Sequence, residues 1–204
     1  MQQMPQGFPP GLIPGQQQVP PERVYVNFAA EVNPVTAQAL LGVMAKLIND
    51  RIPKVTLMLS TPGGVVMSGL TIYNFLRSVP FELTTHNIGN VDSIGNAIYL
   101  SGVHRHACEH STFMFHGVGF QAQPGQRFDE KSVREAQQGL LADQQRIGSI
   151  VAERTKLDQT AVGELFLEAR TKSATDAASV GIVHEIRDVD LPAGGPIISL
   201  VFGS

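Results

Sequence analysis

Apolar residues recur along the chain at two spacings, and these spacings predict strands that alternate with helices. The continuous apolar run at 57–59, inside the segment 54–60, is typical of a strand buried within a parallel sheet. Between residues 34 and 49 the apolar residues recur at helical spacing instead, behind an Asn-Pro pair that favours a helix start. The alternation of the two patterns predicts an α/β fold with a mostly parallel sheet.

The same patterns predict the remaining elements. Strands are expected over 23–28, 81–88, 104–109, 111–115 and 182–186. Helices are expected over 65–77, 93–103, 129–155 and 158–169, with a short one that begins at a capping box over 173–176 and ends at Gly181. The Gly- and Gln-rich segment 117–128 is predicted to be a loop, and the late apolar run 197–202 an edge strand or a subunit contact.

The helix predicted over 129–155 has few apolar residues for its length. They are Val133, Ala136, Leu140, Leu141, Ile147, Ile150 and Val151. A helix with so thin an apolar stripe is expected to pack on another subunit or to lie across the domain. On an isolated monomer, the last five of these residues would form a sizeable exposed apolar patch.

Composition limits the class of protein. With 204 residues, 43% of them hydrophobic, and a net charge of −3, the chain suits one globular domain and lacks the positive charge of a nucleic-acid-binding protein. Residues 1–22 are rich in Gln and Pro and predict a flexible tail without the features of a signal peptide, which leaves 23–204 as the single folded domain. No apolar run is long enough to span a membrane. The single cysteine, Cys108, favours a reducing cytoplasm.

Residues suited to acyl transfer stand at the ends of predicted strands. Ser93 follows the strand 81–88 in a small-residue turn, where its hydroxyl is exposed and the next backbone N–H can face an oxyanion. His116 ends a later strand and is a candidate general base. Gly63 and Gly64 end another strand, and their lack of a Cβ lets the backbone approach a substrate carbonyl closely.

Longer motifs resemble the proteolytic subunit of the Clp protease, family S14 of the serine peptidases. The matching segments are Ser-Thr-Pro-Gly-Gly-Val-Val at 60–66, Leu-Thr-Ile-Tyr-Asn at 70–74, Ser-Ile-Gly at 93–95, Met-Phe-His at 114–116 and a Ser-Ala frame at 173–183. Their order and spacing agree with the family between residues 23 and 186. The resemblance implies a crotonase-like α/β spiral of parallel strands with flanking helices and one long handle-type helix.

The resemblance also implies residue roles. Ser93 corresponds to the nucleophile of a serine endopeptidase and His116 to its general base. The backbone N–H groups of Gly64 and Ile94 correspond to the two donors of the oxyanion hole. No cofactor and no metal ion is implied.

Partners follow from the same resemblance. An extended peptide or unfolded protein is the implied substrate, bound as an added strand with Gly63, Val65 and Gly117 as neighbours. The family self-associates into rings, as a heptamer or tetradecamer, that enclose the sites in a chamber. Its partner is an AAA+ unfoldase, although the Gln/Pro-rich tail replaces the segment by which the family docks that ATPase. Neither a nucleic acid nor a membrane is an expected partner.

Two positions depart from the family. The third member of its catalytic triad is an aspartate, and Ala169 stands at the corresponding position, so the adjacent Glu168 is the candidate replacement. Asp92 stands beside the nucleophile in place of a small neutral residue, where a carboxylate would raise the pKa of a nearby histidine and oppose an oxyanion.

Three functions remain open from the sequence. The first is a serine endopeptidase acting in an oligomeric chamber. The second is a catalytically weak or inactive ring subunit that acts structurally with an active partner, which the two departures favour. The third is a crotonase-like acyl-CoA enzyme, which the Ser93 and His116 pair disfavours because that superfamily needs no such pair.

One further cluster suggests a metal site. His104, His106, Cys108 and His110 alternate along a predicted strand, so their side chains would share a face. Nothing else in the sequence completes a zinc pattern, and a polar strand face is the preferred interpretation.

Overall fold

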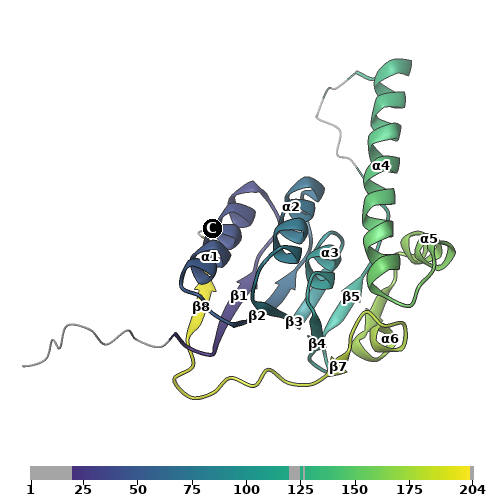
Figure 1. Cartoon of the computed structure of the whole chain (residues 1–204). Coiled ribbons are helices and arrows are strands. Elements are labelled where there is room, and N and C mark those ends of the chain that lie inside the picture. Colours follow the sequence, from purple (N-terminus) through teal and green to yellow (C-terminus); the bar gives the residue numbers. More distant parts are fainter. Residues whose placement is uncertain (1–19, 120–124, 126, 203–204) are drawn as a thin grey trace, which may run out of the picture.

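The computed structural model describes residues 20–119, 125 and 127–202, and a central sheet organises these residues (Figure 1). Its strands are β1 (Arg23–Ala29), β2 (Lys54–Thr61), β3 (Glu82–Asp92), β4 (His104–Ala107), β5 (Thr112–Met114), β6 (Thr171–Ser173), β7 (Glu185–Ile186) and β8 (Ile197–Leu200). The main order is β6-β5-β3-β2-β1-β8, and β4 pairs with both β3 and β7. All pairs are parallel except β5 with β6, so the predicted α/β fold is confirmed.

Helices α1 (Pro34–Asn49), α2 (Val66–Arg77) and α3 (Gly95–Leu100) cover one face of the sheet (Figure 1). The side chain of Asn33 accepts hydrogen bonds from two N–H groups in the first turn of α1, so the helix begins where the sequence predicted. Alternate residues of β1 and β2 point into the hydrophobic core beneath these helices. The segment that follows β7 crosses the other side of the sheet (Figure 1).

Helix α4 (Glu130–Arg154) divides into a projecting half and a buried half (Figure 1). Asp129 caps its N-terminus by accepting from Ser132 N at 2.8 Å. The C-terminal half packs into the core, and the Arg154 guanidinium bonds to the carbonyl of Leu100 at 3.1 Å and that of Gly102 at 3.0 Å. This half of the helix is therefore fixed to the sheet layer.

The expectation of one exposed apolar patch along this helix was wrong in part. Ile147, Ile150 and Val151 are buried in the core, because the last turns of α4 pack against α3 and against α5 (Gln159–Glu168). Val133 and Leu141 lie farther toward the projecting end and are exposed. Only that end of the helix offers an unpartnered apolar surface.

Near the turns, the types of the predicted elements agree better with the structure than their predicted boundaries do. The predicted strand 81–88 continues to Asp92 as β3, and the predicted helix 93–103 is shorter at both ends, as α3. The strand predicted over 182–186 is reduced to β7, because the N–H groups of residues 182 and 183 bond back to the Ala177 carbonyl at the end of α6 (Ala174–Ser179). These backward bonds replace the expected sheet pairing.

The closing apolar run forms an edge strand, as predicted. Strand β8 pairs in parallel with β1, and the Phe202 ring packs edge-on against Phe28 with 6.1 Å between centroids. The tail predicted over 1–22 falls almost entirely on residues 1–19, which lie outside the described residues. Within the described ranges, every helix is too short or too polar to cross a membrane.

Candidate active site

Ser93 lies in a strained turn between β3 and α3. Its φ is 55°, in the left-handed region that non-glycine residues rarely adopt. Hydrogen bonds hold the turn in place. Ser93 N–H donates to the Met114 carbonyl at 2.8 Å, and the Asn96 side-chain amide donates to the Ser93 carbonyl at 3.1 Å and to the Met114 carbonyl at 2.8 Å. Sharp strand-to-helix turns of this kind expose a nucleophilic hydroxyl in other hydrolases.

The glycine loop after β2 packs directly against this turn. Gly63 has a φ of 87°, and a Cβ built on it would lie 2.6 Å from the Ser93 Cβ and 2.8 Å from the Asp92 carbonyl oxygen. Gly64 has a φ of 143°, and its Cβ would lie 2.2 Å from the Val32 carbonyl oxygen. Both glycines are therefore required by the close approach of three chain segments.

Two backbone N–H groups at this junction have no acceptor among the described residues. Gly64 is bridged to Val32 through its neighbours, since Val32 N–H donates to the Gly63 carbonyl and Val65 N–H donates to the Val32 carbonyl, each at 2.7 Å. The Gly64 N–H takes no part in this bridge and, within the described residues, has no hydrogen-bond partner; neither has the Ile94 N–H. Free, adjacent N–H groups are the donors that an oxyanion hole requires.

His116 follows β5 by two residues and is exposed. Its Nδ1 lies 2.7 Å from the carbonyl oxygen of Gly117, and the Gly117 N–H in turn donates to the Phe166 carbonyl at 3.2 Å. When Nδ1 carries the proton and donates to that carbonyl, Nε2 is left as the unprotonated nitrogen. The ring is then able to accept a proton through Nε2.

The structure places five of the predicted site residues around one pocket of about 90 Å³. Its lining residues are Gly64, Val66, Ser93, Ile94, Phe115, His116, Gly117, Val118, Gly119, Ile147 and Phe166. Of the predicted peptide neighbours, Gly117 lines the pocket, Gly63 packs beneath the serine, and Val65 lies exposed at the start of α2.

The apolar walls of this pocket were not predicted from the sequence. Ile147 belongs to α4 and Phe166 to α5, and both are far from Ser93 along the chain. In the sequence, neither residue differs from the other apolar residues of an amphipathic helix. The only available signal was that the two helical stripes both contain large apolar residues close to their ends.

The candidate carboxylates lie outside the pocket lining. Glu168 is exposed at the end of α5, where its carboxylate lies 3.9 Å from the Lys172 ammonium group, and Ala169 follows with a left-handed φ of 48°. Asp92 accepts a hydrogen bond from the Asn90 side-chain amide at 2.8 Å. The role of Glu168 as the third triad member stays a prediction, and in this conformation the Gly117 carbonyl occupies Nδ1 of the histidine.

The histidine-rich segment does not form the shared face that a metal site would need. Strand β4 ends at Ala107, so Cys108 and His110 lie beyond it in a turn and no longer alternate with His104 and His106. In the described part of the chain, no group of three or more His, Cys, Asp or Glu side chains is placed to hold a metal ion.

Several known proteins resemble this chain in sequence or in fold. Two curated relatives, each an "ATP-dependent Clp protease proteolytic subunit", come from Chloranthus spicatus and Vitis vinifera and are 31% identical over 160 and 159 residues. Both alignments cover 75% of this chain, and they cover 76% and 78% of the relatives. The solved structure of a ClpP1 mutant from Listeria monocytogenes has a similar fold, with a TM-score of 0.71 at 20% identity over 81% of this chain and 91% of that one.

The family assignment rests on the longest of these matches. The sequence model of the family described as "Clp protease" matches residues 21–190, which contain the serine turn, the glycine loop and the histidine. Since this match spans well over half of the sequence, the chain belongs to the Clp protease family.

Proposed function

We propose that the chain is a serine endopeptidase that cleaves peptide bonds by acyl transfer between Ser93 and His116. One observation carries the proposal: a strained serine, a histidine and two backbone N–H groups without acceptors all line the same pocket. Each feature alone is common in proteins. Their combination supplies the nucleophile, the base and the oxyanion donors that acyl transfer requires.

In the first half of the proposed reaction, Ser93 Oγ attacks the carbonyl carbon of the scissile peptide bond while its proton passes to Nε2 of His116. The carbonyl oxygen becomes an oxyanion, which accepts hydrogen bonds from the N–H groups of Gly64 and Ile94. The imidazolium that forms is held by the Gly117 carbonyl at Nδ1, 2.7 Å away. That carbonyl supplies partial negative charge where a triad has a carboxylate.

In the second half, the imidazolium donates its proton to the leaving amine, and the C–N bond breaks. The acyl group remains on Ser93 Oγ as an ester. A water molecule, deprotonated by His116, then attacks the ester and releases the carboxylic acid, and the serine hydroxyl is restored. No step requires a cofactor.

The substrate is proposed to be an extended peptide or an unfolded protein. An extended segment adds to exposed backbone by strand pairing, with Gly63, Val65 and Gly117 as its proposed neighbours. Gly63 packs against Ser93 and Gly117 lines the pocket, which supports entry of a strand there. The pocket walls contributed by Ile147 and Phe166 are apolar. We therefore expect cleavage of an unfolded protein such as reduced casein, and inhibition of this cleavage by a fluorophosphonate.

Self-association into rings, as a heptamer or tetradecamer, completes the proposal. The exposed Val133 and Leu141 on the projecting half of α4 support a contact between copies. The curated relatives are named as ATP-dependent, which supports an AAA+ unfoldase as a partner of this chain too. A cytoplasmic location is proposed from the single cysteine.

Sedimentation velocity tests the assembly. The purified chain is expected to sediment as a species several times heavier than its 22.0 kDa, because a monomer would leave the projecting half of α4 without a partner. Exchanging Leu141 for Glu is expected to shift the distribution toward smaller species. A stable 22.0 kDa monomer at micromolar concentration would contradict both the rings and the chamber.

A second candidate function is a ring subunit with weak or no activity. The observation that favours it is the Glu168 carboxylate, which lies beside Lys172 and not at the histidine. Without a carboxylate orienter, a serine and histidine pair retains some activity at a much lower rate. The two functions differ in the rate at which Ser93 reacts.

Exchanging Glu168 for Gln tests the third triad member. If this carboxylate orients His116, the loss of its charge lowers kcat/KM by more than tenfold, with about four decades as the upper limit. Peptide hydrolysis by the purified variant, compared with Lys172→Met, measures the effect. The lysine variant breaks the 3.9 Å ion pair without touching the carboxylate. An unchanged rate in both variants would assign the orienting role to the Gly117 carbonyl.

A further inference from the structure

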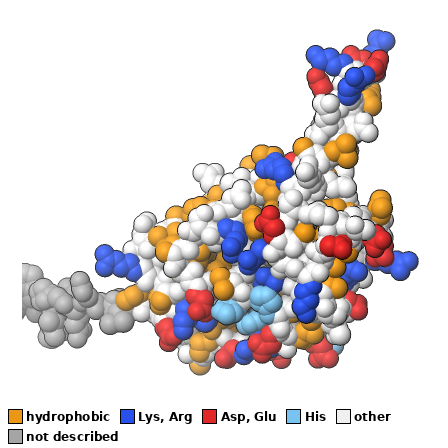
Figure 2. All heavy atoms as spheres, turned by 45° about the vertical axis from the view of Figure 1, so that its right-hand side comes forward, with side chains coloured by type: hydrophobic (Ala, Val, Ile, Leu, Met, Phe, Trp, Pro, Cys, Tyr) orange, Lys and Arg blue, Asp and Glu red, His pale blue; other side chains and the backbone are white. Residues whose placement is uncertain are grey.

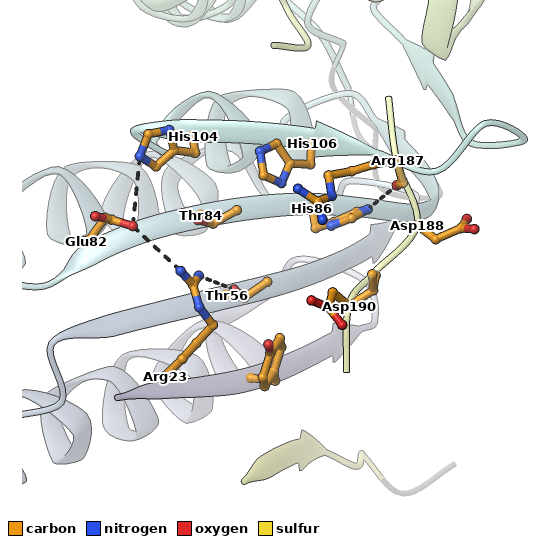
Figure 3. A pocket seen from close by; sticks show the side chains of 12 residues that line it. Arg23, Thr56, Glu82, Thr84, His86, His104, His106, Arg187, Asp188 and Asp190 are labelled. Carbon is orange, nitrogen blue, oxygen red and sulfur yellow. Dashed lines mark hydrogen bonds and ion pairs between the residues drawn. The ribbon is translucent and has the colours of Figure 1, made fainter. Parts of the chain in front are cut away.

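A second cavity, of about 360 Å³, lies on the face of the sheet away from the helices (Figure 3). Its floor is built from the N-terminal halves of β1 to β3 and from β4, and its wall is the segment 187–190. Ser93 follows the C-terminal end of β3, and the two cavities share no lining residue. This cavity is therefore separate from the candidate active site.

The floor of this cavity is polar where a sheet face covered by chain is usually apolar. Side chains alternate along these strands between the hydrophobic core and the cavity. Those that line the cavity include Tyr25, Thr56, Thr84 and His86, and all four are buried. Figure 2 shows histidine side chains gathered on one face of the molecule, among acidic and basic ones. Buried polar groups carry a desolvation cost unless they find partners.

Both arginines of the cavity have an acidic partner, and Figure 3 shows the contacts of Arg23. The Arg23 guanidinium lies 3.7 Å from the Glu82 carboxylate and donates to the Thr56 hydroxyl at 2.9 Å. The Arg187 guanidinium lies 3.6 Å from the Glu185 carboxylate. Neither arginine is left as a free counter-ion for an incoming anion.

Two carboxylates and one hydroxyl of the cavity, in contrast, have no partner among the described residues. Asp188 and Asp190 are exposed on its wall, and neither carboxylate has a hydrogen bond or ion pair to another described residue. Thr84 is only 3% exposed and lines the cavity, and within the described residues its hydroxyl has no hydrogen-bond partner.

His86 adds a further acceptor. Its Nε2 lies 3.0 Å from the Arg187 carbonyl, so this nitrogen carries the proton in the neutral ring and Nδ1 has a free lone pair. Burial lowers the pKa of His86 to about 4, which keeps the ring neutral at pH 7. The ring therefore accepts hydrogen bonds at Nδ1 and does not repel a cation.

We propose that this cavity binds a cation rich in N–H donors, a guanidinium or a primary ammonium group. The carboxylates of Asp188 and Asp190 are its counter-ions, and the Thr84 hydroxyl and His86 Nδ1 accept its hydrogen bonds. A planar guanidinium offers several donors in a fixed geometry and matches a set of convergent acceptors. The same chemistry is present in a basic side chain of a polypeptide and in a free polyamine.

Isothermal titration calorimetry of the full chain tests this site with four probes. They are N-acetyl-arginine amide, its neutral isostere N-acetyl-citrulline amide, N-acetyl-lysine amide and spermidine. The arginine derivative is expected to bind at least tenfold more tightly than the citrulline derivative, because only the former is charged. Tighter binding of the two amino-acid cations than of spermidine assigns the site to a polypeptide side chain, and the reverse order assigns it to a polyamine.

Variants locate the binding. The double exchange Asp188→Asn and Asp190→Asn is expected to weaken binding of the arginine derivative at least tenfold. Thr84→Val is expected to weaken this binding several-fold. Glu164→Gln, an exposed carboxylate on α5 outside the cavity, is the matched control and is expected to have no effect. Thermal unfolding midpoints equal to that of the parent chain show that the variants are folded.

Three results would overturn the proposal: no binding of any cationic probe, equal binding of the arginine and citrulline derivatives, or undiminished binding by the double variant. The site is expected to be intact in Ser93→Ala. A failure of the cation-site proposal is therefore distinguishable from a failure of the proposed peptidase activity.

Discussion

Exchanging Ser93 for alanine is expected to abolish peptide hydrolysis, with a fall in kcat on the order of 10⁶-fold, as for the loss of the nucleophile in other serine peptidases. The reason is that the hydroxyl supplies the bond-forming oxygen, whereas the backbone supplies the structure. The turn is held by Ser93 N–H, by the Ser93 carbonyl and by the Asn96 side chain, none of which the substitution removes.

The fold and assembly of this variant are expected to be unchanged. Circular dichroism and sedimentation velocity on the same sample provide the control, and Ser101→Ala, a buried serine whose hydroxyl bonds to the Ile98 carbonyl, provides a matched variant. Turnover near the parent rate by pure Ser93→Ala, assayed free of contaminating peptidases, would remove this serine from the mechanism.

Exchanging Gly64 for alanine is expected to lower kcat by about 10²–10³-fold, the effect of losing one oxyanion donor. A Cβ at this position would lie 2.2 Å from the Val32 carbonyl oxygen, a distance at which the backbone itself must move. The Gly64 N–H moves with it. The midpoint of thermal unfolding is expected to fall as well, because a backbone clash replaces the bridge to Val32.

Gly42→Ala is the matched control for this variant. Gly42 lies within α1, and a Cβ built on it meets no atom within 4 Å. Alanine has the higher helix propensity, so this exchange is expected to leave the rate unchanged and to raise stability by up to about 1 kcal/mol. Equal activity of the Gly64→Ala variant and the parent would show that the Gly64 N–H does not contact the transition state.

Much of the fold follows from local patterns in the sequence. Helix α1 has the bounds that its apolar spacing and its Asn-Pro start predicted, and Asp129, Asp158 and Ser173 cap the three helices that follow them. These features are readable because each depends on residues close together along the chain. The serine, the histidine and the glycine loop could be singled out as candidate site residues for a related reason, since each stands at the end of a predicted strand.

The remaining features depend on contacts between segments far apart in the sequence. The left-handed φ of Ser93 is held by its hydrogen bond to the Met114 carbonyl and by the close packing of Gly63. Neither contact is visible in the local sequence pattern, which therefore predicted a helix starting at the serine. The burial of Ile147 depends on helix α5 folding back against α4. The polar cavity needs the segment 187–190 to cross four strands.

Whether Ser93 is a reactive nucleophile is tested by covalent labelling of the unmodified chain with a fluorophosphonate, followed by mass spectrometry of the intact protein and of its peptides. We expect one phosphonyl adduct per chain, located on Ser93 Oγ, and loss of labelling in the His116→Gln variant, because the serine reacts only when a base accepts its proton. No adduct on the folded, assembled chain, or an adduct confined to another residue, would contradict a serine peptidase and leave the structural ring subunit as its function.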